Sequence, residues 1–516
     1  MKRLIACGLL VILLGLIGAC GRNGDADPYP SPTPYPYPYD DQNGDYPEPI
    51  PIPPDIPSFD HHEITLTIEP ATRTITSGIS RITFTNRTGQ PLDTIVLRVF
   101  LNAFSEGSMN YVPGFERWIF RHGRDYGYMH IQHVTMNNED MEYDLDGTIL
   151  FLHPDEPLAP EQTVQLVLQY NAYVPMIAHR TGANNQAIWF GMALPILAVF
   201  SDGAWLTPDY YPIGDPFILA MANFDVEIIT PLEYIVAGTG VNTDEIPIED
   251  TGTRVTTFRA NNVRDFAFAV SPYFYRERIN TEGVDIHLYY FTEDLPTDVI
   301  FGFVSNIMEH FSYRIGLYPF DHIRIVETDM FIDYMVFSNM IFVDSAALRR
   351  PYDMALAHAL GRQWFYNVVG NNPVAEPWLN NGLVRYLVWL LFDHTPQRYT
   401  SIANLYIIIG RRDDLSLTDG LWAFVNFQDY HMTHHVKGML MFHALHERMG
   451  DELFWELIRR YFQTFYFRIA TGEDFKNLAD EIYTDSLEEF FSEWFVRRTV
   501  PPLPAIYDGE EEFIVQ

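Results

Sequence analysis

A change in hydrophobic period near residue 278 constrains the fold more than any other feature of the sequence. Between residues 59 and 277, β-branched and aromatic residues alternate with polar ones in segments such as "EITLTIE" and "FDVEIITP", with turns at "EPATR" and "NRTGQP". Beyond residue 278, apolar residues recur at helical spacing, and several of these segments end at Gly. This order predicts an α+β chain, with an all-β domain at 59–277 followed by a mainly helical domain at 278–503.

Short strands are also expected inside the helical domain, around "FDHIRIVETD" and "NMIFVD". The apolar segment "AIWFGMALPILAVF" is interrupted by Pro195 and is shorter than the roughly 20 residues that a membrane span requires. We therefore expect this segment to lie in the core or in a buried loop.

The first 20 residues, "MKRLIACGLLVILLGLIGAC", combine a basic start, a short apolar run and small residues before Cys20. This pattern predicts a lipoprotein signal peptide, because its end resembles the bacterial lipobox, in which the Cys is lipidated. Residues 21–58 are rich in Pro and Tyr, and they predict a polyproline-like tether; a ligand for a proline-recognising domain is the alternative. The predicted location is therefore the extracytoplasmic side of a bacterial membrane, with an acidic tail at 504–516.

The charge and cysteine content exclude several classes of partner and site. The chain has 33 Lys and Arg against 68 Asp and Glu, and its formal charge of −35 argues against nucleic acid or an anionic membrane surface as a partner. The chain has two cysteines. Cys7 would be removed with the predicted signal peptide, Cys20 would be lipidated, and no cysteine follows Cys20. Any metal site must therefore use His, Asp and Glu side chains.

The stretch "HALGRQWFYN" at 358–367 carries part of a metal-binding pattern. A zinc helix of the H-E-x-x-H type places two His one turn apart, with a Glu beside the first as general base. Here His358 occupies the position of the first His, Ala359 that of the Glu, and Arg362 that of the second His.

The longer stretch "YDMALAHALGRQWFYNVVGNNPVAEPWLNNGLVRY" resembles the core of the alanyl aminopeptidase family of gluzincin zinc peptidases, H-E-x-x-H-Q-W-F followed by W-L-x-E-G. The 18 residues between Arg362 and Asn381 match the family's spacing. "YMVFSNMIFVD" is similar to the family's G-M-E-Y-P-G strand and "HVKGMLMFHAL" to its Y-x-K-G motif. The resemblance covers residues of about 59 to 490, and it implies a β-saddle domain followed by a thermolysin-like domain.

The resemblance also assigns roles to six positions, and one of them keeps the family's residue. They are His358 (first zinc ligand), Ala359 (general base), Arg362 (second ligand), Asn381 (third ligand), Val336 (anchor of the substrate amine) and His435 (the transition-state tyrosine). An alanine accepts no proton, and a guanidinium has no lone pair to give to a metal. We therefore expect no bound zinc, no other cofactor and no intact catalytic residue.

Alternatives remain for the histidines and for Arg362. His358 is expected to be a helix residue satisfied by hydrogen bonds rather than a surviving ligand. Arg362 either fills the vacated metal position or reaches solvent. The cluster "HMTHH", with His431, His434 and His435, could build a new metal site with His358, although such clusters without a carboxylate are usually incidental.

The predicted function is that of a catalytically inactive pseudopeptidase that binds a peptide or a partner protein in its former cleft. The candidate binding residues are Arg362, Arg385, His358 and His435, and the two arginines would favour a ligand that bears a carboxylate. One alternative is an active zinc aminopeptidase with atypical ligands. Another is a structural or regulatory partner of an active homologue.

Overall fold

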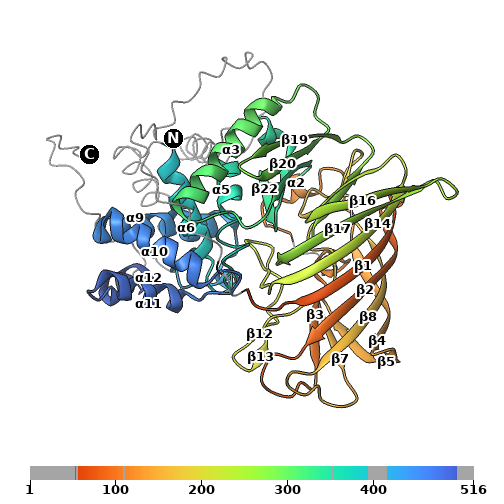
Figure 1. The fold of residues 1–516 in the computed structure, drawn as a ribbon, viewed down its shortest axis with the longest axis horizontal. Coiled ribbons are helices and arrows are strands. Elements are labelled where there is room, and N and C mark those ends of the chain that lie inside the picture. Colours follow the sequence, from red (N-terminus) through yellow and green to blue (C-terminus); the bar gives the residue numbers. More distant parts are fainter. Residues whose placement is uncertain (1–52, 54–55, 109–110, 351–353, 393–414, 497–516) are drawn as a thin grey trace, which may run out of the picture.

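The computed structural model describes the chain except for residues 1–52, 54–55, 109–110, 351–353, 393–414 and 497–516. The predicted signal peptide with Cys20, most of the predicted tether and the acidic tail lie outside the described residues. Among the described residues, no helix has the length and apolar character needed to cross a membrane. Figure 1 shows the strands gathered on one side of the molecule and the helices on the other.

An eight-stranded sheet forms the largest part of the β-rich region. Its strand order is β16 (Val241–Ile248), β17 (Thr253–Val263), β14 (Ala222–Pro231), β1 (Asp60–Glu69), β2 (Thr74–Thr85), β8 (Thr163–Tyr173), β4 (Tyr128–Met136) and β5 (Glu139–Asp140). Strands β1 and β14 are parallel, and the other neighbours are antiparallel. In β1 the alternate residues Ile64, Leu66 and Ile68 are buried, as the sequence pattern predicts.

Smaller sheets complete this region. One contains β15 (Ile235–Gly238), β18 (Phe268–Ser271), β10 (Ile188–Phe190) and β9 (Thr181–Ala183); another contains β11 (Ile196–Leu197), β3 (Ile95–Arg98), β7 (Ile149–His153) and β6 (Glu142–Asp146). The same region also contains a two-stranded sheet of β12 (Phe200–Ser201) and β13 (Ala204–Trp205). Its short helices are η1 (Phe100–Phe104) and α2 (Glu116–Ile119). The apolar segment 187–200 is buried except for Phe200, which is half-buried, so its predicted place in the core is confirmed.

A five-stranded sheet links the two regions. Its order is β19 (Tyr275–Thr281), β20 (Val284–Tyr290), β21 (His322–Thr328), β23 (Met340–Asp344) and β22 (Tyr334–Phe337). The boundary expected between residues 277 and 278 falls inside β19, which pairs with β20. One face of this sheet packs against α3 (Thr297–Arg314) through side chains such as Ile286, Leu288 and Ile325.

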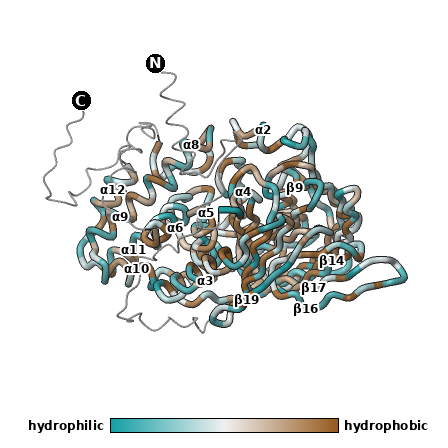
Figure 2. Tube along the Cα trace, turned by 90° about the horizontal axis from the view of Figure 1, so that it is seen from above, coloured by the Kyte–Doolittle hydropathy of each residue, from teal (hydrophilic) through white to brown (hydrophobic). Residues whose placement is uncertain are grey.

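Helices form most of the rest of the described residues, as the change of period predicts. They are α4 (Ser345–Leu348), α5 (Met354–Gly361), α6 (Trp378–Leu391), η2 (Leu421–Ala423), α8 (Phe427–Tyr430), the π-helical η3 (His431–Lys437), α9 (Gly438–Met449), α10 (Asp451–Thr464), α11 (Gly472–Tyr483) and α12 (Glu488–Val496). Figure 2 shows the hydrophobic stretches concentrated in the interior, around α5 and α6. Helix α6 approaches the start of α9 closely, because a Cβ on Gly382 would lie 2.8 Å from the Cα of Gly438.

Arg264, which follows β17, ties the β-rich region to the helical region. Its side chain is 2% exposed, and its N–H groups donate to the backbone carbonyl oxygens of Leu219, Asn367, Val368 and Arg468 at 2.7–3.1 Å. A Cβ on Gly370 would lie 2.3 Å from the guanidinium carbon of Arg264, so the guanidinium occupies the space that a larger residue there would need. Arg264 therefore fixes the turn that follows α5.

Candidate functional site

Helix α5 ends earlier than the sequence pattern predicts. The apolar spacing of "YDMALAHALGRQWFYNVV" favours a helix that continues past Arg362, but α5 ends at Gly361. The amide of Arg362 still bonds to the carbonyl oxygen of His358, whereas the next amide bonds three residues back, from Gln363 to Leu360. Gly361 has low helix propensity, and a Cβ there would lie 2.8 Å from Val384, so close packing favours the glycine at which the helix stops.

Arg362 does not reach solvent, so that alternative is wrong. Its side chain is 7% exposed, and its Nη2 lies 2.6 Å from Oδ2 of Asp215. The guanidinium carbon also lies 4.4 Å from the ring centroid of Tyr366. Burial alone would lower the pKa of Arg362, but the Asp215 carboxylate and nearby tyrosines outweigh it and raise the pKa. Arg362 is therefore a buried cation with a carboxylate partner.

This ion pair corrects one expectation about the floor of the site. The sequence predicts that Arg362 and Arg385 together make the former metal floor basic. Asp215 offsets the charge of Arg362, so this arginine does not present a free positive charge to a ligand. Arg385 lies half-buried in α6, and its charge contributes to the lowered pKa values of nearby histidines.

The residues at the positions of the third ligand and the amine anchor are buried, and they make structural contacts. Asn381 is 1% exposed, and its Nδ2 donates to the carbonyl oxygen of Pro377 at 3.0 Å and to the hydroxyl of Tyr430 at 2.9 Å. Val336 lies in β22 and packs into the apolar core of the helical region. Ala359 is fully buried in the same core.

The expectation that hydrogen bonds satisfy His358 is wrong. The residue is 2% exposed, yet within the described part of the chain neither ring nitrogen has a hydrogen-bond partner. Its ring lies 5.5 Å from that of His435 and 6.1 Å from that of Tyr334. Burial lowers the pKa of His358 well below its ordinary value, and the charges of Arg362 and Arg385 add to the effect, so the imidazole is neutral at physiological pH.

The remaining histidines divide into two environments because they lie on the π-helical turn η3. His431 and His435, four residues apart, stack with a centroid separation of 4.8 Å, and the ring of His435 also lies 5.5 Å from that of His358. His434 instead packs against Phe424 at 4.9 Å. Burial lowers the pKa of His431 to about 3 and that of His435 well below its ordinary value. The site therefore contains three neutral imidazoles at neutral pH, those of His358, His431 and His435.

These residues do not fit a zinc ion. A zinc site needs three protein ligands with available lone pairs, and the second position here holds a cation already paired with Asp215. At the third position, the amide nitrogen of Asn381 donates to two partners. Within the part of the chain that the structure describes, no three His, Cys, Asp or Glu side chains come together in a way that could hold a metal ion.

Residues 333–494 match the family described as "Peptidase family M1 domain". They include the six positions to which the resemblance assigns roles. This region of the chain is similar to a peptidase family M1 domain, and we call it the M1 domain. The predicted resemblance to the alanyl aminopeptidases is thereby confirmed. The M1 domain starts just before β22 and ends in α12, so the five-stranded sheet and α3 begin upstream of it.

Solved structures show the same fold over most of the chain. The M1 zinc metallopeptidase from Deinococcus radiodurans superposes with a TM-score of 0.64 and 18% sequence identity, over 86% of this chain and 95% of that chain. A two-domain M1 zinc metallopeptidase variant bound to L-arginine gives a TM-score of 0.61 at 18% identity, with the same coverage. The predicted α+β architecture, a β-rich region followed by a helical peptidase region, is confirmed.

Relatives found by sequence match over shorter segments. The glutamyl aminopeptidase of Bitis rhinoceros is 22% identical over 261 residues, which are 46% of this chain and 27% of that protein. The aminopeptidase N of Lactococcus lactis subsp. lactis is 24% identical over 183 residues, 31% of this chain and 20% of that protein. The matched region thus spans about a quarter of the length of these relatives or less.

Sequence reasoning missed two residues of the site. Asp215 lies in the loop between β13 and β14, 147 residues before Arg362, and Tyr430 precedes the histidine cluster. No motif marks Asp215. The one available signal was the alternative that Arg362 fills the vacated metal position, because a guanidinium buried there requires a carboxylate somewhere in the chain.

Proposed function

We propose that this M1 domain is catalytically inactive and that the protein binds a peptide or a partner protein at the former active site. The observation that carries the proposal is the 2.6 Å ion pair between Arg362 and Asp215, which puts a paired cation at the position assigned to a zinc ligand. Ala359 adds a second reason, because a methyl group cannot take a proton from water.

The unsatisfied nitrogens of His358 support a binding role. Buried polar groups without a partner are uncommon, and a neutral imidazole offers one donor and one acceptor. A peptide group also carries one donor and one acceptor, so an extended peptide could satisfy both nitrogens. The side chains that now cover His358 must move for this contact to form, because neither nitrogen is accessible.

Metal analysis and an activity assay on the purified protein test the loss of catalysis. We expect much less than one zinc per chain after dialysis and no cleavage of aminoacyl fluorogenic substrates. Stoichiometric zinc, together with cleavage that a chelator abolishes, would instead support an active aminopeptidase with atypical ligands.

A peptide library passed over immobilised protein tests the binding role. Arg362→Met combined with Asp215→Asn removes the ion pair at the site, and Arg259→Gln alters an arginine that is 62% exposed on the β-rich region. We expect the double variant to change the set of retained peptides and Arg259→Gln to leave it unchanged. Retention of no peptide, together with co-purification of an intact zinc-binding homologue, would favour a regulatory subunit.

We also propose that lipidation at Cys20 anchors the protein outside the cytoplasm of a bacterial cell. The support is the sequence pattern before Cys20, which lies outside the described residues. Cys20→Ser is expected to move the protein from the membrane fraction to the soluble fraction. Unchanged fractionation of that variant would contradict the anchor.

A further inference from the structure

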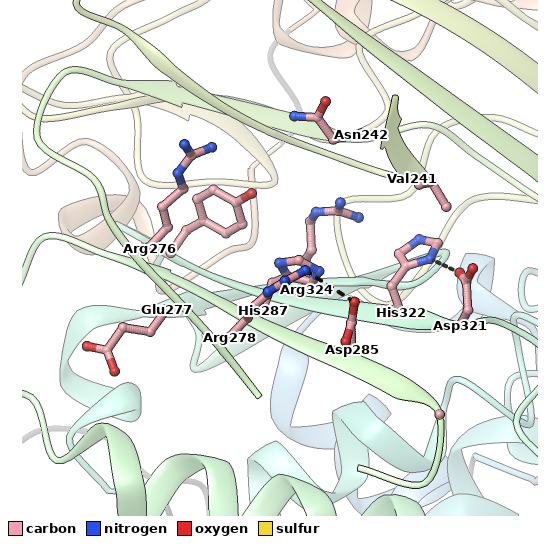
Figure 3. Close-up of a pocket in the computed structure, with 12 residues that line it drawn as sticks. Val241, Asn242, Arg276, Glu277, Arg278, Asp285, His287, Asp321, His322 and Arg324 are labelled. Atoms are coloured by element: carbon pink, nitrogen blue, oxygen red, sulfur yellow. Dashed lines mark hydrogen bonds and ion pairs between the residues drawn. The ribbon is translucent and has the colours of Figure 1, made fainter. Parts of the chain in front are cut away.

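A cavity of about 630 Å³ lies between the hairpin β16–β17 and the five-stranded sheet (Figure 3), and none of the positions that the resemblance assigns to the zinc site lines it. Its walls are mostly polar and charged. They are formed by Val241, Asn242, Arg276, Glu277, Arg278, Gly283, Asp285, His287, Tyr289, Asp321, His322 and Arg324. A cavity of this size is large enough for a small organic ligand.

The alternation of the five-stranded sheet explains why this cavity is polar. One face of the sheet carries Ile286, Leu288 and Ile325, which pack into the apolar core with α3. The opposite face therefore carries the intervening residues, and it faces β16. The result is a charged sheet face that the β-rich region covers only in part.

A row of basic residues crosses three strands on this face. Arg278 of β19 is in register with His287 of β20, and His287 is in register with Arg324 of β21. Like charges placed directly across strands destabilise a sheet, so such a row needs a compensating negative group. Burial and the charge of Arg324 lower the pKa of His287 to about 4, which leaves the two arginines as the charged members of the row.

Each carboxylate around the cavity contacts a side chain other than Arg324. Asp285 lies 3.5 Å from Arg278 and accepts from Asn280, and Asp321 lies 2.6 Å from His322. At the other end of the cavity, Arg276 pairs with Glu245 at 2.7 Å, and Glu277 accepts a hydrogen bond from Tyr290.

Arg324 is the cation that these pairs leave out. It is 2% exposed, its Nη1 donates to the carbonyl oxygen of Gly240, and its Nε has no hydrogen-bond partner within the described residues. No carboxylate of the described chain lies within ion-pair distance of it, in contrast to Arg362 of the M1 site. Figure 3 shows its guanidinium in the middle of the lining residues, between His287 and Asn242. A buried guanidinium without a direct ion-pair partner is unfavourable, and an anion in the cavity would relieve that cost.

We propose that this cavity is a binding site for a small molecule that bears one carboxylate, which pairs with the guanidinium of Arg324. A single carboxylate would give the buried guanidinium of Arg324 the direct ion-pair partner that it lacks within the described residues, and the planar guanidinium matches the planar carboxylate. A phosphate dianion fits less well, because its second charge would lie near the carboxylates of Asp285 and Asp321. Asn242 and Tyr289 supply polar and aromatic contacts for the rest of the ligand.

Isothermal titration calorimetry with N-acetyl-leucine, its neutral amide and inorganic phosphate tests the site on the full-length protein. Wild type is expected to bind the carboxylate at least tenfold more tightly than the amide or phosphate. Arg324→Met should reduce carboxylate affinity at least tenfold. Arg259→Gln is the matched control, because this exposed arginine lies on the same region outside the cavity, and it should leave the affinity unchanged.

A second variant tests the site without removing a buried residue. Asn242→Asp adds a negative charge to the cavity wall, so it should weaken carboxylate binding severalfold even if Arg324→Met does not fold. Equal affinity of wild type for the acid and the amide, tighter binding of phosphate, or equal losses in Arg259→Gln and Asn242→Asp would overturn the proposal.

Discussion

Arg362 of the M1 domain and Asp215 of the β-rich region form a 2.6 Å ion pair across 147 residues of sequence, with side chains 7% and 18% exposed. The pair therefore links the two regions of the protein. Its two members depend on each other, because either one alone would be an uncompensated buried charge.

Removal of one partner of this ion pair should lower the free energy of unfolding. Asp215→Ala leaves the Arg362 cation buried and should lower the free energy of unfolding by about 3 kcal/mol. Arg362→Met combined with Asp215→Asn should cost less than Asp215→Ala alone, since no charge is then left unpaired. Urea unfolding followed by circular dichroism measures both.

The surface pair of Arg460 and Glu481 provides the control, because their side chains are 37% and 63% exposed. Glu481→Ala should cost less than about 1 kcal/mol. Equal costs for Glu481→Ala and Asp215→Ala would show that the Arg362 pair contributes no more than a surface contact.

Restoration of the family's residues should recover a zinc site. The reconstruction consists of Val336→Glu, Ala359→Glu, Arg362→His, Asn381→Glu and His435→Tyr. Arg362→His removes the cation that pairs with Asp215, and the freed carboxylate is then left beside the new ligands, where its negative charge favours a divalent cation. We expect stoichiometric zinc after dialysis in the five-fold variant, measured by elemental analysis, and less zinc in the six-fold variant that adds Asp215→Asn. Equal zinc in the five-fold and six-fold variants would mean that Asp215 does not contribute to metal binding.

The sequence predicted the elements better than it predicted the contacts between them. Alternating burial in β1 and helical spacing in α10 are local patterns, because a strand or an amphipathic helix needs one dry face. The end of α5 at Gly361 was missed, because tertiary contacts decide it. Arg264, nearly a hundred residues upstream, holds the carbonyl oxygens of the turn that follows.

In the candidate site, too, the sequence predicted the positions of motif residues but not the contacts that they make. The resemblance aligned Arg362, Asn381 and His435 with the family's motifs, and the structure places all three beside His358 or its neighbours. Asp215 carries no such marker, because an ion pair between distant loops has no periodic signature in a sequence. The absence of hydrogen bonds to His358 was equally hidden, since it depends on which side chains surround the ring.

Two helix glycines should respond to substitution with opposite changes in stability, because Gly382 lies where α6 contacts α9 and Gly302 lies in open space. Gly382→Ala would place a Cβ 2.8 Å from the backbone of Gly438, so it should destabilise the protein by about 2 kcal/mol. Gly302→Ala lies in α3, where an added Cβ meets nothing within 4 Å, so it should stabilise by about 0.5–1 kcal/mol. Thermal unfolding of the two variants beside wild type measures both signs. A loss of stability in Gly302→Ala equal to that in Gly382→Ala would contradict the steric explanation.

Replacement of Asp265 by a neutral residue should increase the stability of the protein in a pH-dependent way. The residue is 1% exposed, its Oδ1 accepts from the backbone N–H of Ser338 at 2.9 Å, and its Oδ2 has no partner within the described residues. Burial raises the pKa of this carboxyl to about 7, against the opposing effects of that hydrogen bond and of Arg264.

The sign of the pH effect follows from this raised pKa. Between about pH 4 and pH 7 the folded state holds a proton that the unfolded state has lost, so the contribution of Asp265 to stability is complete below pH 4 and is lost as the pH rises through 7. Asp265→Asn cannot ionise. It should therefore match wild type near pH 4 and exceed it at pH 8 by on the order of 2 kcal/mol. Urea midpoints at pH 4, 6 and 8 measure the difference, and Asp250→Asn, in an exposed turn, should follow wild type at all three. A difference between Asp265→Asn and wild type that stays constant with pH would show that Asp265 is ionised throughout the range.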